Sequence, residues 1–115
     1  MSEAEFQQRV TDLCDTLGLT WAHFRPAVEK SGKWSTPMSG RKGFPDLVIA
    51  GPGGVLFVEL KTDTGRLSHD QQHWLDELHD GGSECHVWRP RKWPMIQKRL
   101  TEIAHPRHID VTPSR

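Results

Sequence analysis

The chain is poor in cysteine, has no long apolar run and carries no net charge. Its two cysteines, Cys14 and Cys85, lie far apart, and no CxxC pair occurs. A structural zinc site is therefore not expected, and we interpret both as reduced, buried thiols, with a single disulfide as the alternative. No apolar run approaches the roughly 20 residues that span a bilayer. The polar, acidic start MSEAE is unlike a signal peptide, so we expect a cytoplasmic protein.

The balance of charge limits the kinds of partner. Fifteen Lys and Arg residues face fifteen Asp and Glu residues. A strongly basic DNA-coating protein is excluded, and any contact with nucleic acid must come from local basic patches. The 115 residues, of which 35% are hydrophobic, predict one domain with a compact core. We expect this single domain to include a basic loop at about 27–43 and a frayed tail from about 105.

The most informative stretch is a predicted β-hairpin. Two short apolar runs, LVIA at 47–50 and VLFV at 55–58, flank Gly-Pro-Gly-Gly at 51–54. A two-residue loop and a four-residue loop give the same register, in which Asp46 lies opposite Glu59. Because side chains alternate along a strand, Lys61 shares their face. An odd-length loop or a bulge would slip this register and separate the two acids.

Two opposed acids destabilise a sheet, so the pair needs an explanation. A divalent cation would relieve the repulsion, and oxygen ligands suit Mg²⁺ or Mn²⁺. The ammonium group of Lys61 could then hold a water molecule or stabilise developing negative charge. The alternative is a salt-bridged strand end, in which Glu59 pairs with Lys61. The hairpin by itself leaves both interpretations open.

A predicted helix at 3–17 precedes the hairpin. Its apolar residues recur at helical spacing: Phe6, Val10, Leu13 and Leu17. Ser2 is the expected N-cap. Glu3 falls on the apolar stripe and Glu5 does not, and a carboxylate on such a stripe needs a partner, which a cation would supply. Favourable placement of either acid in the first helical turn is the alternative.

A second predicted helix follows the hairpin and begins at Ser68. Gln71 stands three residues on, as in a capping box. Gln71 also falls on the side of the apolar Trp74 and Leu75, so it either points toward the hairpin or serves only the cap. His69 and His73 have the spacing of helical metal ligands, but no third ligand of that type is near. We therefore interpret them as part of a solvated face.

The remaining segments predict strands at 19–24 and 84–88 and a last helix at 94–103. Residues 27–42 lack periodicity and are rich in basic residues around Trp34, which suits a phosphate backbone and a stacked base. A solvated loop is the alternative. The predicted nucleic-acid contacts, from this region and from the basic cluster at 89–92, are Arg25, Lys30, Lys33, Arg41, Lys42 and Arg89.

Several of these residues together resemble the motifs of a known protein family. Pro45-Asp46 followed by Glu59-x-Lys61 on the next strand is similar to the PD-(D/E)XK nuclease superfamily, and more narrowly to the VRR-NUC family. The α-β-β-β-α-β order also matches, which predicts an α/β fold with a restriction-endonuclease-like core, a small mixed β-sheet flanked by helices. The residues that carry the narrower resemblance are Glu3 with Phe6-Gln7, Gly43-Phe44-Pro45-Asp46, Val58-Glu59-Leu60-Lys61, Leu67-Ser68 with Gln71, Gly82, Val87 and Arg89.

The resemblance implies a set of roles for these residues. Asp46 and Glu59, with the backbone carbonyl of Leu60, would ligate Mg²⁺ or Mn²⁺, and Lys61 would orient or activate the attacking water. Glu3 would complete the site from the first helix, and Gln71 would support it from the second.

The function implied is that of a metal-dependent DNA endonuclease, similar to phage and bacterial nucleases and to relatives that cut branched or junction DNA. Some of these relatives are dimers, and a homodimer suits so small a domain. Two alternatives remain. One is a catalytically silent nucleic-acid-binding module that keeps the fold, and the other is a protein-interaction domain whose acids form a structural salt bridge.

Overall fold

The computed structural model describes residues 1–24, 27–28, 34–35 and 39–106. Each predicted helix and strand is present, with ends that differ by up to a few residues. The elements in chain order are α1 (Glu3–Thr16), β1 (Thr20–His23), β2 (Ala27–Val28), β3 (Trp34–Ser35), β4 (Leu47–Gly51), β5 (Gly54–Leu60), α2 (His69–Asp80), β6 (Glu84–Trp88), the 3-10 helix η1 (Pro90–Lys92) and α3 (Trp93–Ala104).

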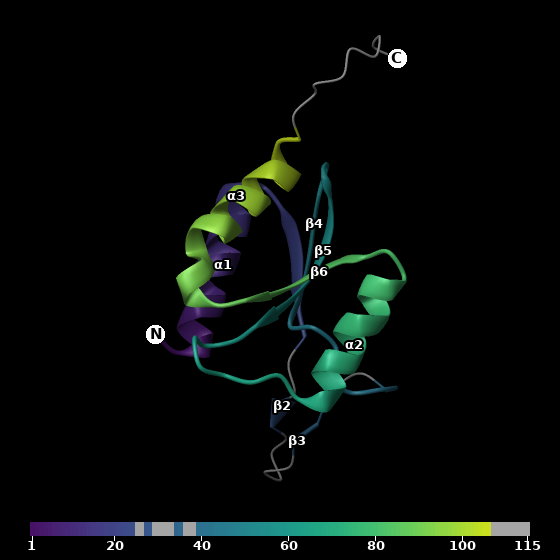
Figure 1. Ribbon diagram of the computed structural model, residues 1–115. Coiled ribbons are helices and arrows are strands. Elements are labelled where there is room, and N and C mark those ends of the chain that lie inside the picture. The colour runs from purple at the N-terminus through teal and green to yellow at the C-terminus, as the bar shows by residue number, and fades with distance from the viewer. Residues whose placement is uncertain (25–26, 29–33, 36–38, 107–115) are drawn as a thin grey trace.

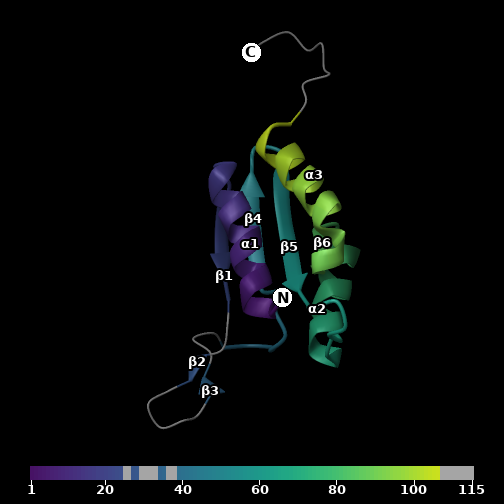
Figure 2. The same cartoon turned by 90° about the vertical axis from the view of Figure 1, so that its left-hand side faces the viewer.

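Four strands form a mixed sheet between two layers of helices. The strand order is β1-β4-β5-β6, with β5 and β6 parallel and the other neighbours antiparallel. Helices α1 and α3 cover one face of the sheet and α2 covers the other (Figures 1 and 2). This α/β arrangement confirms the predicted fold class and is compatible with a restriction-endonuclease-like core.

The segment expected to be a basic loop contains two short strands. Residues 27–42 contain the strands β2 and β3, which pair antiparallel in a small separate sheet. Two-residue strands are too short to show an alternating pattern in the sequence. In Figure 2 this pair lies beyond the end of the main sheet at which β5 finishes.

The hairpin has the predicted register. Its loop consists of Pro52 and Gly53, and Gly51 pairs with Gly54. The N–H of Gly53 donates to the carbonyl of Ile103 at 2.8 Å. A Cβ on Gly53 would lie 2.8 Å from the Ile103 Cα, so only glycine fits this approach. Packing of the tip on α3 therefore fixes the loop and, through it, the register.

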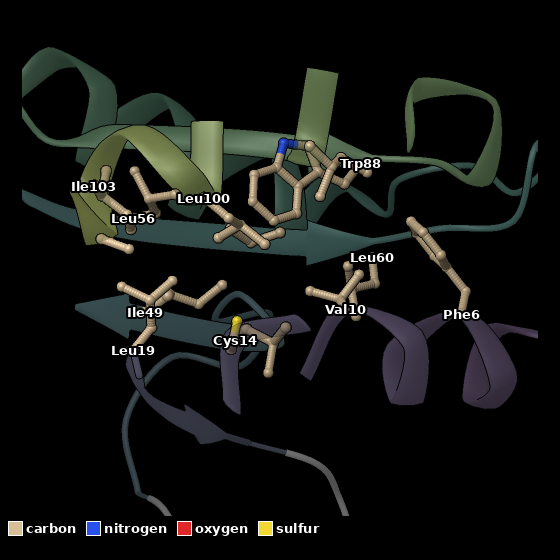
Figure 3. Packing of buried hydrophobic residues seen from close by; sticks show 14 residues of the cluster. Phe6, Val10, Cys14, Leu19, Ile49, Leu56, Leu60, Trp88, Leu100 and Ile103 are labelled. Carbon is tan, nitrogen blue, oxygen red and sulfur yellow. The ribbon is translucent and has the colours of Figure 1, made fainter. Parts of the chain in front are cut away.

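The main core lies between the sheet and the helices α1 and α3 (Figure 3). Phe6 and Val10 of α1 are fully buried there, as is Cys14. Cys14 and Cys85 are both free thiols, so the disulfide alternative is wrong. Burial raises the pKa of Cys14 to about 12. Cys85 is only half-buried, contrary to expectation, because β6 is an edge strand of the sheet.

A separate aromatic cluster fills the space between the sheet and α2. Phe44 makes edge-to-face contacts with Phe24, Phe57 and Trp74, at ring-centroid distances of 5.4, 6.1 and 5.0 Å. Such pairs add to the stability gained from burial alone. The cluster holds the segment that leads into β4 against α2.

None of the helices in the described ranges is long and apolar enough to cross a membrane.

Candidate active site

Asp46 and Glu59 meet where β4 begins and β5 ends. Leu47 pairs with Val58, and continuing this register by one residue places Asp46 opposite Glu59. The backbone of Asp46 extends the sheet, because its carbonyl accepts the N–H of Phe24 at 2.9 Å. Its carboxylate accepts the N–H of Leu60 at 2.8 Å. The side chain of Asp46 is thereby fixed across the end of β5.

Glu59 is the most unusual residue of this site. Its side chain is only 1% exposed, yet among the described residues its Oε2 atom has no hydrogen-bond partner. Burial raises the pKa of Glu59 to about 9, with further contributions from the Asp46 carboxyl, as hydrogen-bond partner and as charge, and from Glu3; Lys61 opposes the shift. Two carboxyls form a hydrogen bond only while one holds a proton. Ionising both carboxyls would therefore place more negative charge here than the protein groups of the site neutralise.

Gln71 connects α2 to this carboxyl. Its Oε1 accepts the N–H of Ser68 at 2.9 Å, while the Ser68 hydroxyl accepts the Gln71 N–H at 3.1 Å, which completes a capping box. Its Nε2 donates to Oε1 of Glu59 at 3.3 Å. The two alternatives drawn from the sequence, a capping role and a contact with the hairpin, thus hold together. One amide group uses its oxygen for the helix cap and its nitrogen for the site.

The first helix separates the roles of its two N-terminal acids. Glu5 forms a capping box with Ser2, and its side chain accepts the Ser2 N–H at 2.9 Å. The capping role therefore belongs to Glu5. Glu3 is exposed at the first residue of α1 and lies close enough to raise the pKa of Glu59. In Figure 2 the N-terminus of α1 lies beside the end of β5.

Lys61 follows directly on the last residue of β5. Its backbone N–H donates to the carbonyl of Trp88 at 3.0 Å, which extends the pairing with β6 by one bond. Its side chain is partly exposed, and its positive charge acts on Glu59. An ammonium group is thus available beside the two carboxyls without being buried among them.

The donor chemistry fits a divalent cation. Asp46 and Glu59 provide carboxylate oxygens, and the unpartnered, buried Oε2 atom is the kind of group that a cation satisfies. Within the ranges that the structure describes, no three His, Cys, Asp or Glu side chains come together as a metal-binding group. Two side-chain carboxylates are therefore the centre of this site, and the other oxygen ligands would be backbone carbonyl, water or substrate.

The predicted nucleic-acid contacts have different surroundings. Arg25, Lys30 and Lys33 lie outside the described residues. Arg41 and Lys42 are close to Asp70, at 3.4 and 3.6 Å. Nη1 of Arg89 donates to the carbonyls of Thr62 and Gly65, both at 2.7 Å. The guanidinium of Arg89 therefore braces the connector after β5.

Sequence reasoning missed one basic residue of that connector. Arg66 is exposed and, in the part of the chain that the structure describes, has no hydrogen-bond or ionic partner. It lies five residues after Lys61 and five before Gln71. Its place between Lys61 and Gln71 can be read from the sequence, but no local pattern there marks it as exposed.

Comparison with known proteins identifies the family. The model of the VRR-NUC domain matches residues 18–92, which is more than half of the chain. The matched range includes Asp46, Glu59, Lys61 and Gln71, whereas Glu3 precedes it. No curated protein and no solved structure matches the chain. With its nuclease-like fold and its paired carboxyls at the end of the hairpin, the chain belongs to the VRR-NUC family of nucleases.

Proposed function

We propose that this nuclease is a metal-dependent DNA endonuclease, with Asp46 and Glu59 as the central ligands of Mg²⁺ or Mn²⁺. The observation that carries the proposal is the buried Glu59 carboxyl beside Asp46, with an oxygen that no described protein group satisfies. Burying an unpaired polar atom destabilises a fold by about 1–3 kcal/mol. A cation at this position would remove that penalty.

Each residue of the site has a separate task in this proposal. Asp46 and Glu59 would hold the cation, with the Leu60 carbonyl as a further ligand and Glu3 as a supporting acid. Gln71 fixes the orientation of the Glu59 carboxyl through its bond to Oε1. Lys61 orients the water that attacks the phosphorus atom and offsets the negative charge that develops on the phosphate. The bound cation would lower the pKa of that water and neutralise charge.

The substrate we propose is DNA, which the enzyme would cut at internal phosphodiester bonds, with a preference for branched or junction forms. The protein has no net charge, so contacts with phosphate must come from basic residues near the site. Lys61 and the exposed Arg66 both lie on the connector between β5 and α2, next to the site. A domain of this size covers little of a duplex, and a homodimer would present two sites to a branched substrate.

A cleavage assay tests the proposal. The wild type, incubated with Mg²⁺ or Mn²⁺, is expected to cut plasmid DNA and at least one member of a panel of flaps, splayed arms, four-way junctions and linear duplex. Asp46→Asn and Lys61→Ala are expected to lower the rate by two or more orders of magnitude, roughly the effect of removing one electrostatic stabiliser.

Two controls make the assay specific. Asp76→Asn and Lys98→Ala remove the same charges from exposed helix positions and should leave the rate unchanged. If the wild type cuts and Asp46→Asn cuts equally well, the assignment of the site is wrong. If the wild type binds branched DNA but cuts none of the panel with either metal, the chain is the silent binding module instead.

A further inference from the structure

Asp70 lies beside both the site and two of its basic neighbours. It occupies the first turn of α2, directly before Gln71, whose amide contacts Glu59. Its carboxylate is 3.4 Å from the guanidinium of Arg41 and 3.6 Å from the ammonium of Lys42. Two cations that precede Asp46 by a few residues thus face the acid next to Gln71.

The segment that carries the two cations is docked independently of this charge. The indole Nε1 of Trp74 donates to the backbone carbonyl of Arg41 at 3.1 Å. Gly43 has φ +95°, and a Cβ there would lie 2.6 Å from the Asp70 carbonyl carbon. Phe44 packs edge-on against Trp74. Backbone and aromatic contacts therefore hold Arg41 and Lys42 at the start of α2, whether or not Asp70 is charged.

The ion pairs themselves are easily exchanged. The side chain of Lys42 is 85% exposed and that of Arg41 52%, against 31% for Asp70. Exposed pairs at such distances contribute little to stability because water competes for both charges. A phosphate group that approaches from solvent can take over both cations without unfolding any element.

We infer that Arg41 and Lys42 form a phosphate clamp next to the site, and that Asp70 limits its strength by competing with the phosphate. The ligand is the sugar-phosphate backbone of the DNA strand that the site would cut, so the inference rests on the proposed function. Each of the two cations exchanges one acid for another when DNA binds. Neutralising Asp70 leaves both cations free and strengthens binding.

The test measures binding without cleavage. The probe is a short fluorescein-labelled DNA duplex at low ionic strength, in EDTA, with affinity read by fluorescence anisotropy. Asp70→Asn is expected to bind about two- to fivefold more tightly than the wild type, the range that an exposed ion pair allows. The gain should shrink as salt is added, because exposed charges are screened. Asp70→Ser removes the charge with a different side chain and should behave alike.

Two comparisons separate this mechanism from a general effect of charge. Asp76→Asn removes an equal charge from an exposed position on the same helix and should give a clearly smaller gain. In a protein that already carries Arg41→Gln and Lys42→Gln, Asp70→Asn should give no gain. The inference is overturned if Asp70→Asn and Asp70→Ser bind no better than the wild type, if Asp76→Asn matches them, or if the gain survives without the two cations.

Failure of the inference and failure of the proposed function give different results. Binding is scored in EDTA and does not depend on the metal, whereas the proposed function is scored by cleavage. A wild type that binds duplex and never cuts contradicts the proposed function and leaves the comparison of Asp70 variants valid. A wild type that cuts normally, with no effect at Asp70, contradicts only the inference.

Discussion

Replacing Glu59 by glutamine is expected to stabilise the protein when no metal is bound and to abolish its response to Mg²⁺ or Mn²⁺. Glu59 is buried, Gln71 satisfies one of its oxygens at 3.3 Å, and the other has no partner within the described residues. Asp46 faces it with a second carboxyl. In Glu59→Gln the oxygen that accepts from Gln71 remains, while the new amide N–H can donate to Asp46.

The size of the effect follows from these contacts. Converting an unsatisfied buried polar atom into a hydrogen-bonded one contributes about 1–3 kcal/mol to the free energy of unfolding. For a domain of this length, that corresponds to a rise in Tm of roughly 4–12 °C. The wild type should instead gain stability from the cation by mass action, about 2.7 kcal/mol at a metal concentration one hundred times Kd.

The assay is a thermal melt in EDTA and in a titration of each metal. The Tm of Glu59→Gln should lie above that of the wild type in EDTA and stay constant as metal is added, while the wild-type Tm rises. Glu77→Gln, at an exposed helix position, is the matched control and should follow the wild type throughout. A Glu59→Gln variant that is less stable in EDTA, or that gains as much from metal as the wild type, would refute the reasoning.

Three further predictions concern the support of the site. Gly43→Ala should lower the free energy of unfolding by roughly 2–4 kcal/mol in urea denaturation, because a Cβ at this position of φ +95° meets the α2 backbone. The control Gly40→Ala, at φ +105° with open space around it, should lower it by about 1–2 kcal/mol. Equal losses in the two variants would rule out the contact with α2. Arg99, which binds both carboxylate oxygens of Glu84, and His86 lower the pKa of that carboxyl from 4.5 to about 2. The contribution of the Glu84 charge to stability is therefore full above pH 4.5 and is lost as the pH falls toward 2. With the side chain a third exposed, Glu84→Gln should lose about 1–2 kcal/mol at neutral pH and match the wild type near pH 2 in acid denaturation; a loss independent of pH would contradict the charge effect. Arg89→Gln should lower the free energy of unfolding by about 1–3 kcal/mol without weakening DNA binding. Arg66→Gln should leave stability unchanged and reduce the slope of log binding constant against log salt concentration by about 1. The reverse pattern in thermal melts and fluorescence anisotropy would refute both roles.

The sequence was sufficient for the hairpin because its local features agree. Both loop lengths that fit the glycine-rich turn give one register, so the opposition of Asp46 and Glu59 did not depend on choosing between them. Helix caps were equally local: Ser2 and Ser68 each bond to a residue three positions away. Contacts of this range follow from spacing alone.

Features that depend on long-range packing were not predictable. Arg41 and Asp70 are separated by 29 positions, and Arg89 reaches Thr62 across 27. Only the fold decides whether such a residue faces solvent, an acid or a backbone carbonyl. A list of basic residues from the sequence therefore does not distinguish Arg89, whose guanidinium binds two backbone carbonyls, from Arg66, which is exposed.

The two hydrogen bonds of the Gln71 side-chain amide have a consequence for dynamics. Its oxygen is occupied by the Ser68 N–H and its nitrogen by Glu59, so the helix cap and the site share one rigid group. Any change that orders the Glu59 carboxyl should slow the exchange of the Ser68 amide hydrogen with deuterium. Hydrogen exchange at the Ser68 amide thus offers a reporter of cation occupancy at the site, read at the start of α2.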